Sequence, residues 1–477
     1  MTQPSLAEVS WQLLNSAAHL YRDSPRASRW LVGSMARFTE PPRIAVAGAA
    51  GVGKSTLVNA LAGEHIAPIE VADGVSVFAW YRDGGEPAAE VWPPGAAPYP
   101  VPVVRQDRAL HIDLSQWQPD QVERVVVDWP SRGLRDMTVV DTPSATGAEW
   151  LAAQADAIVY ATREPGEDDL ALLRSAQTGV GGPITTIVAM TRADELGGGR
   201  IDALSSAKQV ARRRRSEAAV FAVSQNVVAV AGLLGEAGRT LRDDEFVALR
   251  ALAGISRAEL DTYLLSADRF AHGDLPVRLS PEARAGLLDR FGLFGIRLAG
   301  TLIRRGADTQ AGLAGQLVQR SGVSELRDSI GSFFLERADV LRARSALAAL
   351  QVVLRAEPRP QARPLADGLE RAIAGAHDFT ELRLLSALRS GRLTLPGTLA
   401  DVAERLTGGV GTAVPERLGL APDAPIDDLR NTCYDELSQW RAQAESPLLG
   451  AAQHAAARAV VRSCEGILAE LTPARAY

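Results

Sequence analysis

Several residue types and patterns are scarce in this sequence, and each shortage excludes a class of protein. Only two cysteines occur, Cys433 and Cys464, which excludes a disulfide-stabilised scaffold and a zinc site built on cysteines. No stretch of about 18 apolar residues occurs, so no transmembrane helix is expected. The start of the chain lacks a basic region followed by an apolar core, so no signal peptide is expected either. The sequence therefore predicts a cytoplasmic protein.

Positive charge is also in short supply. The 51 Lys and Arg residues are outnumbered by 57 Asp and Glu residues, which gives a net charge of −6. Dedicated nucleic-acid-binding proteins are usually more basic than this, so we expect no nucleic-acid partner. Only two of the 51 cationic residues are lysines, Lys54 and Lys208. The excess of arginine fits a GC-rich coding bias.

What the sequence does contain is the composition of a large globular protein. Its 477 residues exceed one ordinary domain, so two or three domains are expected. Hydrophobic residues make up 46% and charged residues 23%, which suits a large core and excludes a wholly disordered chain.

Apolar spacing predicts an α/β region after a short helical start. Residues 4–22 repeat apolar side chains at helical spacing. From residue 43, short apolar runs bounded by turns alternate with helical patterns, which predicts a mostly parallel sheet flanked by helices. Residues 93–102 are rich in proline and are expected to form a loop. The expected strands are residues 44–47, 77–80, 122–129, 138–141, 157–160, 184–190 and 220–223.

After residue 280 only helical patterns remain. Ser280, Pro281 and Glu282 supply an N-cap, a first-turn proline and an acidic first turn. Apolar stripes beyond them predict helices of about 25–30 residues, roughly 40–45 Å long, packed as a long antiparallel bundle. The expected division is N-terminal helices that join the bundle (residues 1–40), an α/β domain (41–280) and the helical bundle (281–477).

The strongest chemical signal is a glycine-rich segment between an expected strand and an expected helix. Backbone N–H groups of such a loop wrap nucleotide phosphates, its lysine reaches the β- and γ-phosphates, and its serine holds Mg²⁺. The alternative is a plain glycine turn, but that leaves a lysine at the one required position unexplained. The segment is Gly48, Ala49, Ala50, Gly51, Val52, Gly53, Lys54 and Ser55, followed by Thr56, and it fits G-x-x-x-x-G-K-[ST] in full.

A second acidic segment suits the metal side of the same site. Asp141 closes an expected strand, and its spacing after Lys54 suits a carboxylate that acts on Mg²⁺ through water. Ser144 lies three residues after Asp141 in the same segment. An aspartate that ends a strand is commonly only a turn residue.

Two later segments indicate which base is bound. Thr191, Arg192 and Asp194 follow another expected strand, and a carboxylate there can accept both the N1–H and N2–H₂ hydrogen bonds of guanine. Adenine lacks that pair of donors. Ser224 is expected past the next strand, where a backbone N–H could meet the guanine O6. Together, behind a phosphate-binding loop, these segments favour GTP over ATP.

At these residues the sequence resembles the GTPase superfamily, and the long helical flanks narrow the resemblance to bacterial dynamin-like GTPases. Further short sequence segments resemble the actinobacterial isoniazid-inducible (Ini-type) branch, and this resemblance covers about residues 1–340. The segments lie at residues 45–48, 58–61, 66–68, 80–82, 128–130, 140–143, 287–292 and 321–326.

The resemblance implies an architecture and partners. It implies a GTPase (G) domain on a helical neck and trunk, self-association through paired G domains, and GTP/GDP with Mg²⁺ as cofactors. It also implies peripheral contact with an anionic lipid membrane, on the inner face of the cell membrane, through a tip near residues 391–422. The alternative for that segment is a structural role only, as an interhelical loop with a short helix.

The sequence departs from the family pattern at three places. The first two predict slow hydrolysis, whereas the third is mild, because a serine keeps the backbone N–H that faces the γ-phosphate in the family. Ala50 and Gly51 stand where the family has a polar residue that orients the attacking water. Val75 stands where a threonine would bind Mg²⁺ and the water, so Ser76 beside it becomes the catalytic candidate together with Lys54 and Ser55. Ser144 replaces a glycine.

Three hypotheses follow for function. The first is a dynamin-like GTPase that couples slow GTP hydrolysis to G-domain association and membrane remodelling. The second is a catalytically weak nucleotide-binding subunit that assembles with a dynamin-like paralogue. The third, a regulatory GTPase of ribosome assembly, is disfavoured because no basic RNA-binding domain is present. The four-arginine run at residues 212–215 is interpreted as a solvated helix end.

Overall fold

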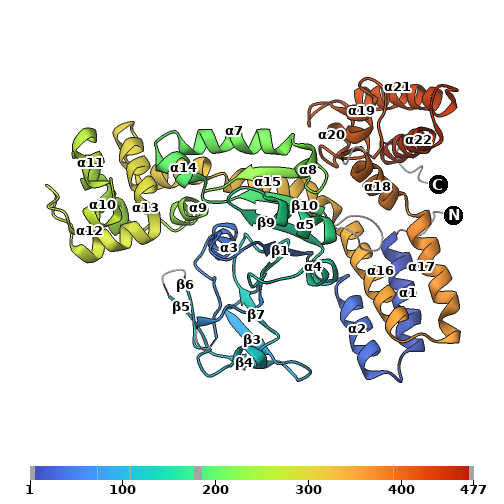
Figure 1. The fold of residues 1–477 in the computed structure, drawn as a ribbon, viewed down its shortest axis with the longest axis horizontal. Coiled ribbons are helices and arrows are strands. Elements are labelled where there is room, and N and C mark those ends of the chain that lie inside the picture. Colours follow the sequence, from blue (N-terminus) through green and yellow to red (C-terminus); the bar gives the residue numbers. More distant parts are fainter. Residues whose placement is uncertain (1–5, 72–73, 107–108, 177–184, 390–391, 472–477) are drawn as a thin grey trace.

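A nine-stranded sheet forms the centre of the molecule, and helices flank it and extend to both sides (Figure 1). The computed structural model describes residues 6–71, 74–106, 109–176, 185–389 and 392–471. The predicted fold class, a mostly parallel sheet flanked by helices plus a large helical portion, is confirmed. The sheet strands are β1 (Arg43–Ala47), β2 (Ala79–Asp83), β3 (Ala88–Trp92), β4 (Tyr99–Val101), β7 (Arg124–Trp129), β8 (Thr138–Asp141), β9 (Ala157–Thr162), β10 (Thr185–Met190) and β11 (Asn226–Ala229).

The strand order is β11-β10-β9-β1-β8-β2-β7-β3-β4, and the five strands from β11 to β8 are all parallel. Val46, Val139 and Val159 on these strands are fully buried, as expected for parallel strands that are covered on both faces. Beyond β8 the sheet is mixed, because β2 and β3 each run antiparallel to a neighbour.

The antiparallel extension was only partly predicted. Residues 93–102 were expected to be a loop, but they contain β4, which pairs with β3. A separate hairpin of β5 (Val103–Gln106) and β6 (Ala109–Ile112) follows. Apolar and polar residues alternate only weakly in these short strands. The prolines of residues 93–102 therefore led to the prediction of a loop.

One predicted strand is wrong. Residues 220–223 lie in and just after the short helix α8 (Ala218–Phe221), and the next strand is β11, which pairs in parallel with β10. Val220 and Val223 are buried with Ala211 of α7 (Ala203–Arg215), so their apolar character serves helix packing. The signal for β11 was the longer apolar run at residues 227–231, which ends at Gly232.

The helices nearest the sheet are short, and those past it form a separate group. Against the sheet lie α3 (Lys54–Ala62), α4 (Ala148–Gln154), α5 (Glu167–Ala176) and α7, and the four-residue helix α6 (Leu196–Gly199) lies just before α7. The group past it comprises α9 (Gly232–Arg239), α10 (Asp243–Ala253), α11 (Arg257–Tyr263), α12 (Ala267–His272), α13 (Pro281–Arg304) and α14 (Gln310–Ser321). The next helix, α15 (Val323–Phe333), returns to the sheet and shares its core.

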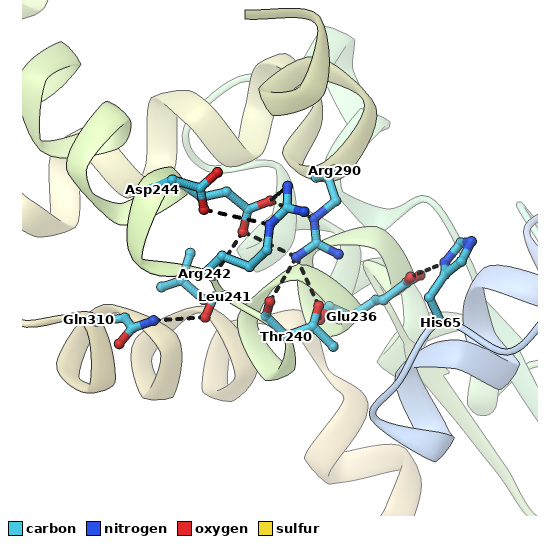
Figure 2. A network of polar contacts seen from close by, with 9 residues as sticks. His65, Glu236, Thr240, Leu241, Arg242, Asp244, Arg290 and Gln310 are labelled. Atoms are coloured by element: carbon cyan, nitrogen blue, oxygen red, sulfur yellow. Dashed lines mark hydrogen bonds and ion pairs between the residues drawn. The ribbon is translucent and has the colours of Figure 1, made fainter. Parts of the chain in front are cut away.

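A polar network ties this group to the sheet region, as Figure 2 shows. Arg290 of α13 donates to Thr240 at the end of α9 and to Glu245 of α10. Glu236 of α9 pairs with His65, in the loop after α3, at 2.7 Å. Because α13 and α14 share a core with α9 to α12, and α15 packs on β10 and β11, residues 281–333 pack with the α/β region.

The N-terminal helices pack with the remaining helical part. Helices α1 (Leu6–Leu20) and α2 (Pro25–Ala36) pack against α16 (Ala338–Ala356) and α17 (Arg363–Gly375), around buried leucines such as Leu14, Leu31 and Leu350. The individual helices are shorter than expected. Apolar residues recur at helical spacing from Leu326 to Leu354, which predicts one continuous helix. In the structure α15 ends at Phe333 and α16 begins at Ala338.

A last cluster contains α18 (His377–Arg389), α19 (Leu399–Leu406), α20 (Val414–Leu418), α21 (Ile426–Glu445) and α22 (Ala451–Leu471). Its core includes both cysteines, Cys433 and Cys464, which are buried free thiols. Leu395 and Leu406, from the segment proposed as a tip, are also buried in this core. The packing therefore favours the alternative of an interhelical segment with short helices for residues 392–422. Gly391 lies outside the described residues.

None of the helices in the described ranges combines the length and the apolar composition needed to cross a bilayer.

Candidate nucleotide-binding site

The predicted site residues gather at one edge of the sheet. The loop of residues 48–53 follows β1, residues 142–144 follow β8, and residues 191–194 follow β10. All three strands are parallel, so their carboxyl ends meet at the same edge, where ligands bind in open α/β sheets. Because β1 lies between β8 and β9, the phosphate loop has the metal-side segment on one flank and the base-side segment on the other.

Backbone conformation explains the glycines of the loop. Gly48 has φ 150°, and a Cβ added there would lie 2.1 Å from the carbonyl oxygen of Ala161 in β9. Gly51 and Gly53 have φ 69° and 96°, in the region that favours glycine. The loop therefore runs close against β9, with Ala49, Ala50 and Gly51 exposed at its crest.

Lys54 is the buried cation of the site. Its Nζ donates to the carbonyl oxygens of Gly48 at 3.0 Å and Ala49 at 2.9 Å, and to Ser144 Oγ at 3.1 Å. All three acceptors are neutral oxygens, and burial lowers the pKa of Lys54. An ammonium group with neutral partners inside a glycine loop suits an anionic ligand.

Asp141 and Ser55 are the residues predicted to hold Mg²⁺. Ser55 Oγ donates to Asp141 Oδ2 at 2.8 Å, so the two predicted ligands of Mg²⁺ lie in contact. The other carboxylate oxygen, Oδ1, is buried without a hydrogen-bond partner. Burial, opposed by Ser55 and Lys54, raises the pKa of Asp141 to about 6. A buried, unsatisfied carboxylate beside a hydroxyl is an oxygen donor set that fits Mg²⁺ or its water.

The base side is tied to the phosphate loop. Thr191 Oγ1 donates to the carbonyl oxygen of Val52 at 2.5 Å. Arg192, at φ 52°, donates to the carbonyl oxygen of Gly51 at 2.8 Å. Asp194 follows in a short turn of helix, half-buried, and burial raises its pKa. The segment thus holds a carboxylate beside the loop, where the sequence places the guanine contact.

Ser224 does not reach this edge. It lies just before β11, at the amino end of the strand, and its hydroxyl donates to the carbonyl oxygen of Asn226. The predicted position of Ser224 past the strand is therefore wrong, because the strand itself was misplaced. The backbone that follows β11 at the correct edge is Val230 to Gly232. Val230 accepts from Ala193 N at 3.3 Å, and Gly232 lies beside Thr56.

Ser76 lies in a short hairpin that leads into β2. It pairs with Glu70, and both Ser76 and Val75 are exposed. Ala79, three residues later, is the register partner of Asp141, so the hairpin approaches the phosphate edge of the sheet. The ring of Phe78 stacks on Trp150 of α4, with centroids 4.2 Å apart. This stack joins the segment before β2 to the helix that follows residues 141–144.

Comparison with known proteins identifies relatives along nearly the whole chain. No protein-family model matches the sequence. The isoniazid-induced protein IniC of Mycobacterium tuberculosis, from strains CDC 1551 / Oshkosh and ATCC 25618 / H37Rv, is 38% identical over 457 residues, which is 92% of this chain and 92% of the relative.

Two solved structures of an oligomerised bacterial dynamin pair, described as sensing and tethering membranes over long range, align along 99% of this chain. They are 11% and 12% identical, are covered to 75% and 77% of their length, and give TM-scores of 0.34 and 0.33.

The identity to IniC confirms the isoniazid-inducible branch that the short sequence segments indicated, and the chain belongs to the IniC family.

Proposed function

We propose that the protein is a dynamin-like GTP-binding protein that hydrolyses GTP slowly and couples its nucleotide state to G-domain association and to membrane binding and remodelling. The observation that carries the proposal is the contact set around Lys54 and Ser55. The lysine follows a loop whose conformation requires glycine at three positions, and the serine contacts Asp141 from the neighbouring strand.

In this proposal each segment has a distinct task. The loop N–H groups and Lys54 bind the phosphates, and Ser55 with Asp141 would hold Mg²⁺. The cation, when bound, would neutralise charge on the terminal phosphates. Thr191 and Arg192 brace the loop through Val52 and Gly51, and Asp194 reads guanine. The membrane-facing location on the inner surface of the cell membrane rests on the family resemblance.

Phosphate release from GTP tests the proposal directly. We expect slow turnover by the purified protein and none by Lys54→Ala, with Lys208→Ala, which removes the other lysine, as the matched control. Equal phosphate release by wild type and Lys54→Ala would contradict the proposed site.

A second candidate is a nucleotide-binding subunit with little turnover that assembles with a dynamin-like partner. It is favoured by the absence of a polar side chain at Ala50 and Gly51 and by the apolar, exposed Val75. GTP binding without turnover would support it, whereas efficient hydrolysis by the purified chain alone would exclude it.

A further inference from the structure

We propose that the hydroxyl of Ser144 is a catalytic group that contacts the terminal phosphate of GTP and positions the attacking water. This inference rests on the proposed function and deepens it, because the family pattern gives a role only to the backbone N–H at this position. It concerns a position where a serine replaces the usual glycine.

The side chain of Ser144 already lies at the phosphate-binding lysine. Lys54 Nζ donates to Ser144 Oγ at 3.1 Å, across the gap between the β1–α3 loop and the segment after β8. A serine hydroxyl accepts and donates at once, so Ser144 can keep this bond and still donate its own proton to a phosphate oxygen or a water. Its exposed side chain leaves room for such a ligand.

The backbone accommodates this serine without strain. Arg192 is the one non-glycine residue of the described chain whose φ lies in the left-handed region. Ser144 therefore does not adopt a conformation that requires glycine. The replacement adds a hydroxyl to the site and leaves the N–H in place.

The neighbouring positions lack the groups that this hydroxyl would replace. Ala50 and Gly51 at the crest of the loop carry no polar side-chain atom, and neither does Val75 in the hairpin before β2. Asp141 is engaged with Ser55 on the metal side. Ser144 is the polar side chain that contacts Lys54, the residue that reaches the β- and γ-phosphates.

The chemical step follows from this placement. The oxygen of water forms a bond to the γ-phosphorus, the bond from phosphorus to the β–γ bridging oxygen breaks, and that oxygen keeps the electron pair on GDP. The proton of the water passes to the released phosphate. Ser144 contributes by orientation and by a hydrogen bond to a group that gains charge, which in enzymes affects rate strongly.

The test compares Ser144→Ala and Ser144→Gly, which lack the hydroxyl, with Ser144→Thr, which keeps it. Thr146→Ala is the control, because it removes a hydroxyl from the same loop. That hydroxyl donates to the carbonyl oxygen of Pro143. Two quantities are measured: the ratio of affinities for the slowly hydrolysed analogue GTPγS and for GDP, and kcat for phosphate release.

We expect Ser144→Ala and Ser144→Gly to bind GDP as wild type does, while their preference for GTPγS over GDP falls by about fivefold or more and kcat falls by about tenfold or more. Ser144→Thr and Thr146→Ala should retain both quantities. If all variants keep the wild-type preference for GTPγS over GDP, the inference is overturned whether or not turnover is measurable. Failure of the wild-type protein to bind either nucleotide would instead overturn the proposed function.

Discussion

At the residue scale, Gly48 carries the sharpest steric constraint of the phosphate loop. Its added Cβ would lie 2.1 Å from a carbonyl oxygen of β9, which cannot move without disturbing the centre of the sheet. The motif predicted Gly48 and Lys54, and two further segments predicted Asp141 and Asp194. The structure brings all four to one edge because parallel strands carry them there. Ser224 could not be placed, because its position depended on a strand that the apolar pattern located wrongly.

Replacing Gly48 by alanine should therefore abolish GTP binding and destabilise the fold by about 1–3 kcal/mol, the usual cost of overpacking. The control is Gly33→Ala in α2, where an added Cβ has nothing within 4 Å. That change should be neutral or slightly stabilising, since alanine is the better helix former. Urea denaturation and equilibrium binding of GTP measure both effects. Wild-type affinity in Gly48→Ala would show that the loop conformation is misassigned.

His65 gives a pH dependence that belongs to a single pair. Its hydrogen bond to Glu236 raises the pKa of His65 above the ordinary 6.5, against the opposing effects of burial and of Arg290. A raised folded-state pKa means that the pair stabilises the protein fully below pH 6.5 and that this stabilisation is lost as pH rises through the folded value.

The difference in urea midpoint between wild type and His65→Gln should therefore be largest near pH 5.5 and should shrink toward pH 8.5. His65 is exposed, so the difference should be modest. His111→Gln, at an exposed position of β6, is the control and should show no such trend. A difference that grows with pH would mean that the pair is not charged as inferred.

At the scale of elements, α4 connects the nucleotide site to the helical part. It follows residues 141–144, and its Trp150 stacks on Phe78. Beyond its end, Asp156 is 1% exposed and binds Arg37, the residue after α2, at 2.7 Å and Ser345 of α16 at 2.5 Å. The neighbouring Arg344 is fully buried and donates to the carbonyl oxygen of Ala155.

Asp156→Ala would leave Arg37 as a buried cation without its carboxylate and would remove the negative charge that favours the buried cation of Arg344. We expect a loss of stability of about 3–5 kcal/mol, as for other broken buried pairs. Asp339→Ala is the control, because Asp339 pairs with Arg342 at the start of α16 but is 80% exposed. Thermal and urea unfolding should show a small effect for the control. An equally small effect for Asp156→Ala would mean that the joint contributes little.

The sequence predicted the helices and strands whose apolar patterns are clear and bounded by turns. It failed where a short helix has the apolar composition of a strand, and where two successive helices share one apolar pattern. Strands β1, β8, β9 and β10 were found because buried parallel strands are continuous apolar runs. The four-residue helix α8 looked like a strand, and the break between α15 and α16 left the apolar stripe uninterrupted. Both features depend on contacts with residues far away in the sequence, so the residues of each segment alone do not reveal them.

At the scale of the whole molecule, the proposed function predicts nucleotide-dependent association. We expect gel filtration with light scattering to show a larger species with GTPγS than with GDP, and vesicle flotation to show binding to anionic lipid. The Lys54→Ala variant should show no change in mass with either nucleotide. An unchanged mass with GTPγS together with an absence of flotation would contradict the dynamin-like part of the proposal.

Binding of guanine nucleotide at the edge of the sheet around Lys54 can be measured by competition with a fluorescent GTP analogue at equilibrium in the presence of Mg²⁺. We expect unlabelled GTP and GDP to displace the analogue, ATP to leave it bound, and Lys54→Ala to fail to bind it. Displacement by ATP as readily as by GTP, or unchanged binding by Lys54→Ala, would show that this edge is not a guanine-nucleotide site.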